Sequence, residues 1–111
     1  MKTRLLAFLL MLLTGHAQAQ LSEPTLVEKQ RAIELKRSEL TAKKQAVADA
    51  HAKLQEQCWQ RFAVNDCLRD VRRAQRKALE PVEAALLELN ASDRLLRLQE
   101  REQRLLDKAH H

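Results

Sequence analysis

The chain has 111 residues, of which 45% are apolar, and it carries a formal net charge of +5. Its aromatic residues are one Trp and two Phe, and it has one Gly and two Pro. So few aromatic side chains exclude a large globular core, and so few turn residues exclude a protein built from hairpin-linked strands. The composition therefore predicts an all-α protein of extended shape.

The first twenty residues have the layout of a secretory signal peptide. Lys2 and Arg4 form a basic start, residues 5–13 are an unbroken apolar run, and Ala17 and Ala19 frame a small-residue cleavage site. A run this short cannot cross a hydrocarbon core, which needs about 20 residues. We expect cleavage after Ala19, with no lipid modification because no Cys follows the site.

Cleavage would leave one domain, residues 20–111, in the periplasm. The domain would lose two of the 20 basic residues and keep all 15 acidic ones, so its net charge would be +3. An oxidising compartment favours disulfide bonds between its two cysteines.

The first predicted arm is one amphipathic helix over about residues 24–60. Pro24 suits a first helical turn, and Ser22 is a candidate N-cap. Apolar residues then recur at seven-residue steps, at Leu26, Ile33, Leu40, Val47 and Leu54. The positions three and four residues after each of them are mostly polar, so the stripe is narrow and needs a neighbouring helix.

The second predicted arm covers about residues 67–109 and is richer in leucine. Its apolar residues follow three-and-four spacing, which indicates a helix that can pack against the first. Pro81 removes an interior hydrogen bond and should bend this helix or break it. The register also slips at Asn90–Asp93, where Ser92 or Asp93 could cap a separate final helix. The pattern leaves open one bent helix or two helices.

The two cysteines define the predicted corner between the arms. Cys58 and Cys67 are nine residues apart, which in an unbroken helix separates them by about 13.5 Å along the axis. A disulfide requires Cα atoms within about 7 Å, so the chain must turn between them, at about residues 61–66. Asn65 or Asp66 could cap the helix that follows. We therefore predict an antiparallel helical hairpin clamped by an intramolecular disulfide.

The residues between the cysteines include most of the aromatic content of the chain. Trp59, Phe62 and Val64 are expected to fill the wide end of the hairpin as a small local core. The alternative is that they form an exposed recognition tip.

Other uses of the cysteines fit the pattern less well. A redox-active pair is typically spaced C-x-x-C, and zinc needs further ligands at matching spacing. His51 lies two helical turns before Cys58, while His110 and His111 are at the chain end. An intermolecular disulfide is a further alternative. We predict no catalytic residues, metal or cofactor, because no constellation of suitable side chains is visible.

A basic turn follows the second cysteine, with Asp70 as its one acid. Its cations are Arg69, Arg72, Arg73, Arg76 and Lys77. They form either a solvated helix face or a contact with anionic envelope components such as lipid headgroups and lipopolysaccharide phosphates. Nucleic acid is not an expected ligand, since no aromatic residue is interleaved with the arginines.

The C-terminal end of the second arm is predicted to extend beyond the start of the first arm. A corner near residues 62–65 sets Leu54 near Val71 and Leu26 near Leu98, so residues from about Arg101 onward project past the first arm. The candidate contact residues in this part are Leu95, Leu96, Leu105 and Leu106. Uncovered leucines at helical spacing favour self-association or docking of an envelope protein.

The segment "CWQRFAVNDC" followed by "LRDVRRAQR", behind a secretion signal and a polar helix, resembles a group of small exported proteobacterial helical proteins of uncharacterised function. The resemblance implies an envelope location in a Gram-negative bacterium and a helical hairpin. With the other patterns, it gives the expectation of a non-enzymatic periplasmic protein with a structural or protein-binding role. The alternative expectation is a binder of anionic envelope components.

Overall fold

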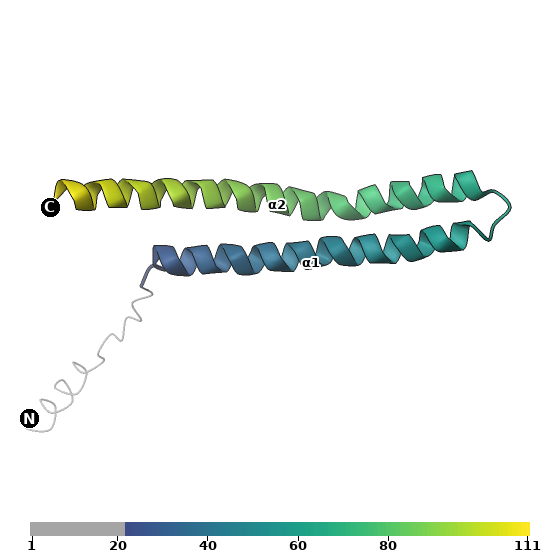
Figure 1. Cartoon of the computed structure of the whole chain (residues 1–111), viewed down its shortest axis with the longest axis horizontal. Coiled ribbons are helices and arrows are strands. Elements are labelled where there is room, and N and C mark those ends of the chain that lie inside the picture. Colours follow the sequence, from purple (N-terminus) through teal and green to yellow (C-terminus); the bar gives the residue numbers. More distant parts are fainter. Residues whose placement is uncertain (1–21) are drawn as a thin grey trace, which may run out of the picture.

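The structure, a computed structural model, describes residues 22–111; the predicted signal peptide, residues 1–19, lies outside them. The described part is an antiparallel hairpin of two long helices, which confirms the predicted fold (Figure 1). Helix α1 spans Leu26–Cys58 and helix α2 spans Val64–Ala109. None of the described helices is long and apolar enough to cross a membrane.

Helix α1 starts two residues later than the sequence indicated. Its N-cap is Thr25, whose hydroxyl accepts a hydrogen bond from the Glu28 amide at 3.3 Å. The Glu28 carboxylate in turn accepts one from the Thr25 amide at 2.7 Å, which completes a capping box. The assignment of Ser22 as cap and Pro24 as first-turn residue was therefore wrong. A reciprocal pair satisfies two free amides, whereas Ser22 would satisfy one.

The seven-residue apolar repeat of α1 faces α2 only over part of its length. Leu40 is buried, but Leu54, at the end of the repeat, is 42% exposed. A helix with 3.6 residues per turn drifts about 20° per heptad, so a strict seven-residue repeat rotates away from a straight partner. His51 and Gln55 are half-buried beside Leu54 instead, and Cys58 completes the seam.

Helix α2 is one unbroken helix, so the alternative of a separate final helix was wrong. Pro81 lies inside it and is exposed, while Val82 beside it is buried. The helix continues through the predicted break at Asn90–Asp93. There the Ser92 hydroxyl donates to the Glu88 carbonyl one turn earlier, at 3.2 Å, and caps nothing.

The start of α2 also differs from the prediction. The helix begins at Val64, and its N-cap is Ala63, which makes no side-chain capping bond. Asn65 and Asp66 were predicted to be caps, but they lie in the first helical turn. Asp66 still favours this helix end electrostatically, because a negative side chain in the first turn interacts well with the helix dipole. The corner consists of residues 59–63, so it begins two residues before the predicted corner at residues 61–66 and is one residue shorter.

The register between the helices is close to the predicted one. The prediction sets Arg37 opposite residue 88 and Lys44 opposite residue 81. In the structure, Arg37 bonds to Asn90 and Asp93, and Lys44 pairs with Glu83 at 3.9 Å. The contacts therefore lie two to five residues further along α2.

The two helices differ in length, 33 residues against 46, and the difference lies at one end. Figure 1 shows the C-terminal end of α2 running past the start of α1. All residues from 101 to 111 are exposed, as the antiparallel register predicted. The two ends of the hairpin are therefore different surfaces: a closed corner, and a single projecting helix.

Candidate functional site

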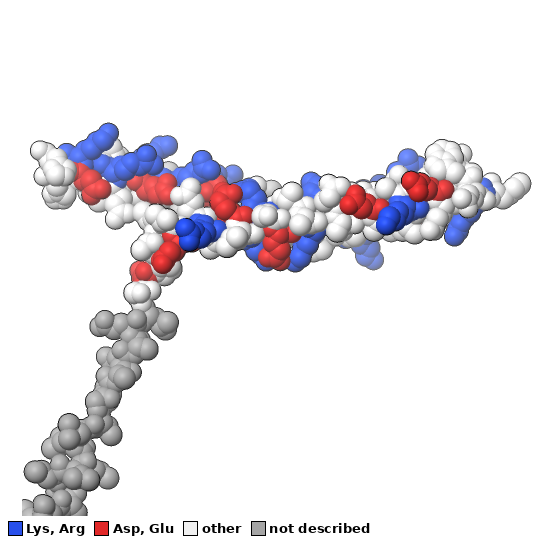
Figure 2. Space-filling view, turned by 60° about the horizontal axis from the view of Figure 1, so that its bottom comes forward, with Lys and Arg blue, Asp and Glu red and all other residues white. Residues whose placement is uncertain are grey.

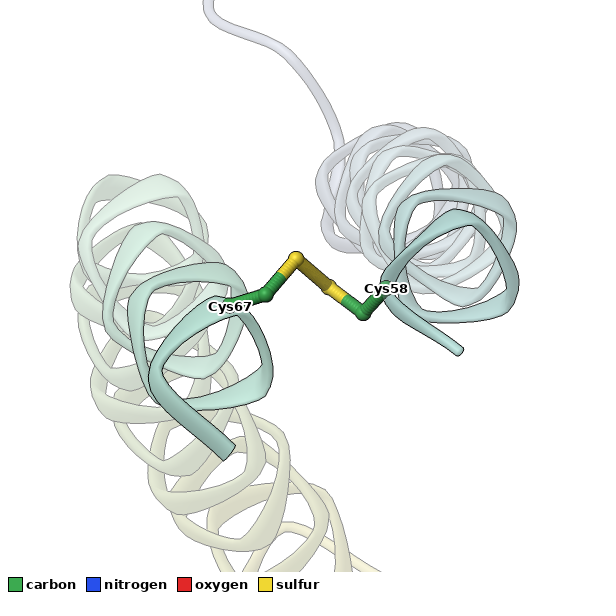
Figure 3. The surroundings of a disulfide bond; sticks show 2 residues. All are labelled: Cys58 and Cys67. Carbon is green, nitrogen blue, oxygen red and sulfur yellow. A yellow bond between two sulfur atoms is a disulfide. The ribbon is translucent and has the colours of Figure 1, made fainter. Parts of the chain in front are cut away.

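The corner is closed by the predicted disulfide between Cys58 and Cys67 (Figure 3). Cys58 is the last residue of α1 and is fully buried, while Cys67 is in the first turns of α2. Their Cα atoms are 5.5 Å apart, inside the range that a disulfide allows. The described residues contain no free cysteine.

The aromatic residues of the corner do not form the predicted local core. Phe62 is fully exposed and Trp59 is 68% exposed, while Val64 is half-buried. The disulfide holds the helix ends so close that a bulky side chain has no room between them. The prediction of corner packing by Trp59 and Phe62 was wrong, and both residues lie on the surface of the tip.

The backbone of the corner is hydrogen-bonded to the end of α1. The amides of Trp59, Gln60 and Arg61 donate to carbonyls of residues 56–58 at 3.0–3.3 Å. On the other side, the Cys67 amide donates to the Ala63 carbonyl at 3.1 Å. With the disulfide, these bonds present the side chains of the tip on an ordered backbone.

The basic turn is exposed along the first turns of α2. This holds for Arg69, Arg72, Arg73, Arg76 and Lys77. Among them, Arg69 pairs with Asp66 at 2.9 Å, within the same helix. Their three-and-four spacing puts most of them on the side of α2 that faces away from α1. The candidate anion-binding residues are therefore brought together on one face, next to the aromatic tip.

A polar cluster connects the helices near the other end. The Arg37 guanidinium donates to the Asn90 side-chain oxygen at 2.8 Å and to the Asp93 carboxylate at 3.4 Å. Arg97 bonds to the same carboxylate at 3.2 Å, and this hydrogen bond raises the pKa of the Arg97 guanidinium. Asp93, predicted as a possible helix cap, instead joins the two helices.

Paired leucines divide the C-terminal half of α2 into two faces. Leu96 is 5% exposed and packs against α1, whereas its neighbour Leu95 is 63% exposed. Adjacent residues in a helix point about 100° apart, so only one of each pair can face α1. Leu96 was predicted to bind a partner, but it belongs to the hairpin core. Leu95 is free to do so.

The outward leucines form a second apolar stripe on α2. Leu95, Leu98 and Leu105 follow three-and-four spacing, interrupted by Glu102, and Leu106 lies beside Leu105. All four are more than half exposed, and Leu87 extends the set toward the corner. We call Leu95, Leu98, Leu105 and Leu106 the C-terminal leucine stripe. The sequence analysis missed Leu98 and Leu87, although the spacing from Leu95 was a signal for Leu98.

A row of cations runs beside this stripe. It consists of Arg94, Arg97, Arg101, Arg104 and Lys108, again at three-and-four spacing. Figure 2 shows Lys and Arg gathered along one edge of the C-terminal part of α2, with acidic side chains below them. Two acidic residues pair with the row: Asp93 bonds to Arg97 at 3.2 Å, and the Glu100 carboxylate lies 3.8 Å from the Arg104 guanidinium.

The described residues hold no group of three or more His, Cys, Asp or Glu side chains suited to a metal ion. His51 makes a 2.7 Å hydrogen bond between its Nδ1 and the Val47 carbonyl, within α1. The surface features that remain are therefore the aromatic and basic tip at one end and the C-terminal leucine stripe at the other.

Comparisons with protein-family models, with curated proteins and with solved structures found no match to this chain.

Proposed function

We propose that this protein is a non-enzymatic component of the bacterial cell envelope, exported to the periplasm, which binds another protein through the C-terminal leucine stripe of α2. The observation that carries the proposal is the exposure of Leu95, Leu98, Leu105 and Leu106 on a helix that outruns its partner. Leucines at this spacing on one helix face suit the groove of another helix or helix pair.

The architecture supports binding in preference to catalysis. The described residues bury only four apolar side chains well, at Leu40, Cys58, Val82 and Leu96. Most side chains of the two helices are therefore exposed along the length of a rod-shaped molecule. Such a shape offers a long contact face for a helical partner, which is either a second copy or another envelope protein.

Substitution of the stripe tests the proposal. We expect Leu98→Ser with Leu105→Ser, or truncation after Glu100, to abolish either the dimer mass in sedimentation or the capture of a defined envelope protein. Both changes should leave the disulfide and most of the helicity intact, because these residues do not pack against α1.

The matched control is Val27→Ser with Leu35→Ser, which removes two exposed apolar side chains from α1. Association that survives the α2 changes, or that is lost equally with the control, contradicts the proposal. So does a full-length protein that stays monomeric at high concentration and binds no envelope protein.

A further inference from the structure

Positive charge is concentrated at the corner end of the hairpin. Residues 59–77 contain six cations and two acids, a net charge of +4. The remainder of residues 20–111 contains 12 cations and 13 acids, a net charge of −1. The net positive charge of the predicted mature chain therefore lies at the corner and in the first 14 residues of α2, which rise about 21 Å, and it attracts anionic surfaces to that end.

The same end carries both aromatic side chains of the described residues. Phe62 is fully exposed and Trp59 is 68% exposed, on a corner held by the disulfide and by its backbone hydrogen bonds. An ordered backbone reduces the conformational entropy lost when the tip binds. Arg61 lies between the two aromatics and is also exposed.

From these observations we propose that the tip of the hairpin docks on an anionic phospholipid bilayer, with Phe62 and Trp59 entering the boundary between headgroups and acyl chains. Arg61 and the basic turn of α2 then lie at the level of the lipid phosphates. Trp is favoured at this boundary because its ring is apolar and its N–H remains near water. Arginines near an anionic surface strengthen binding by about fivefold each.

The convex shape of the tip favours a bilayer as occupant. A protein partner would need a matching concave pocket for the two rings, whereas lipid headgroups rearrange around a protruding side chain. The cations follow the outer face of α2 for about three turns behind the tip, so a hairpin that leans toward this face brings them to the phosphates together. The proposal goes beyond the protein-binding role of the C-terminal leucine stripe, which lies at the opposite end.

Trp59 is the only tryptophan of the chain and reports directly on the tip. We expect its fluorescence to shift to the blue when the oxidised protein meets vesicles of equal parts phosphatidylglycerol and phosphatidylcholine. Vesicles of phosphatidylcholine alone should give no shift, and high salt should weaken the binding by screening the arginines. Phe62→Ser should weaken binding about tenfold, because it removes a ring that becomes buried in the bilayer when the tip docks.

Two triple variants test whether vesicle binding depends on the positive charge near the tip or on the positive charge of the protein in general. Arg72, Arg73 and Arg76 changed to Gln should weaken vesicle binding at least about tenfold. Arg94, Arg101 and Lys108 changed to Gln remove the same charge from the other end and should leave binding within about twofold, since their distance from the tip exceeds the screening length. All these residues are exposed, so circular dichroism should show unchanged helicity.

The lipid assignment is overturned by several outcomes. One is the lack of a shift on anionic vesicles, and another is equal loss of binding in the two triple variants. A shift with lipopolysaccharide micelles or with soluble polyglutamate, but not with vesicles, would assign the tip to those ligands instead. None of these results bears on the leucine stripe, which its own variants test.

Discussion

Among single residues, Asp93 shows how one side chain holds the open end of the hairpin. Its carboxylate accepts hydrogen bonds from Arg37 on α1 and from Arg97 on its own helix, and its side chain is only 15% exposed. A partly desolvated carboxylate between two guanidiniums gains more from its hydrogen bonds than a solvated pair does. Asn90 adds a third contact to the cluster.

We therefore expect Asp93→Ala to lower the free energy of unfolding by about 1 to 2 kcal/mol. Arg97→Gln is the control, because the Arg97 side chain is 71% exposed and its pair lies within one helix; it should cost less than about 0.5 kcal/mol. Urea unfolding followed by circular dichroism measures both. Equal effects of the two variants would show that the hydrogen bond from Arg37 on α1 to Asp93 on α2 contributes nothing to the free energy of unfolding.

Glu39 offers a residue-scale prediction on titration. Hydrogen bonds from Lys43 and Lys36 lower the pKa of its carboxyl below the ordinary range. Because the pKa is lower in the folded state, the ionised side chain favours folding above its unfolded pKa, and this contribution is lost as the pH falls through the folded pKa. NMR titration should show a depressed pKa that rises in Lys43→Gln. An unchanged pKa in that variant would contradict the assignment.

At the scale of the helices, the paired leucines separate the core from the surface. Leu96→Ala should lower the free energy of unfolding by about 2 kcal/mol, since it empties a buried position in a thin interface. Leu95→Ala, one residue earlier and exposed, should change it by less than about 0.5 kcal/mol. The same urea experiment compares them. A larger effect at Leu95 would mean that α2 is rotated relative to the structure.

The sequence predicted the helices and their antiparallel order because these depend on local patterns: scarce turn residues, apolar spacing, and two cysteines that only a turn can join. It also predicted the overhang after Arg101, since the register follows from the corner. The corner aromatics were assigned wrongly because packing between two helix ends depends on their separation, which the disulfide makes too small for Trp59 and Phe62.

The other wrong predictions concerned the cap of α2 and the leucine that faces α1, and their cause is similar. Asn65 and Asp66 are good capping residues, but α2 already begins at Val64, so both lie inside its first turn. Leu95 and Leu96 have the same chemistry, so no composition argument tells which faces α1. The residues that face α1 can be identified only when the 3.6-residue period of both helices is followed along the chain, because positions seven residues apart shift around the helix from one heptad to the next.

For the whole molecule, the disulfide is the contact that most restricts the unfolded chain. Closing a loop of about ten residues should stabilise the hairpin by about 2.5 to 3 kcal/mol, on the chain-entropy model. We expect Cys58→Ser with Cys67→Ser to lower the free energy of unfolding by that amount while the helices persist at low temperature. Mass spectrometry of the non-reduced protein should show a monomer lighter by two hydrogens, and free thiols on protein purified without reductant would contradict the bond.

The two ends of the rod then have separate roles in our account, with an anionic surface at the tip and a protein partner on the C-terminal leucine stripe. A hairpin with α2 about 69 Å long keeps these sites far apart, so each can be disabled alone. The Arg72, Arg73 and Arg76 variant should therefore retain protein binding. The Leu98 and Leu105 variant should retain vesicle binding.

The most direct test of the proposed function is site-specific photocrosslinking in living cells, with a photoreactive residue placed at Leu98 or Leu105, and at Leu35 on α1 as the control. All three positions are exposed, so the substitutions should not disturb the fold. We expect one discrete adduct in the envelope fraction, shared by the two α2 positions and missing from the α1 position. No adduct from either α2 position, or an identical adduct from Leu35, would contradict it.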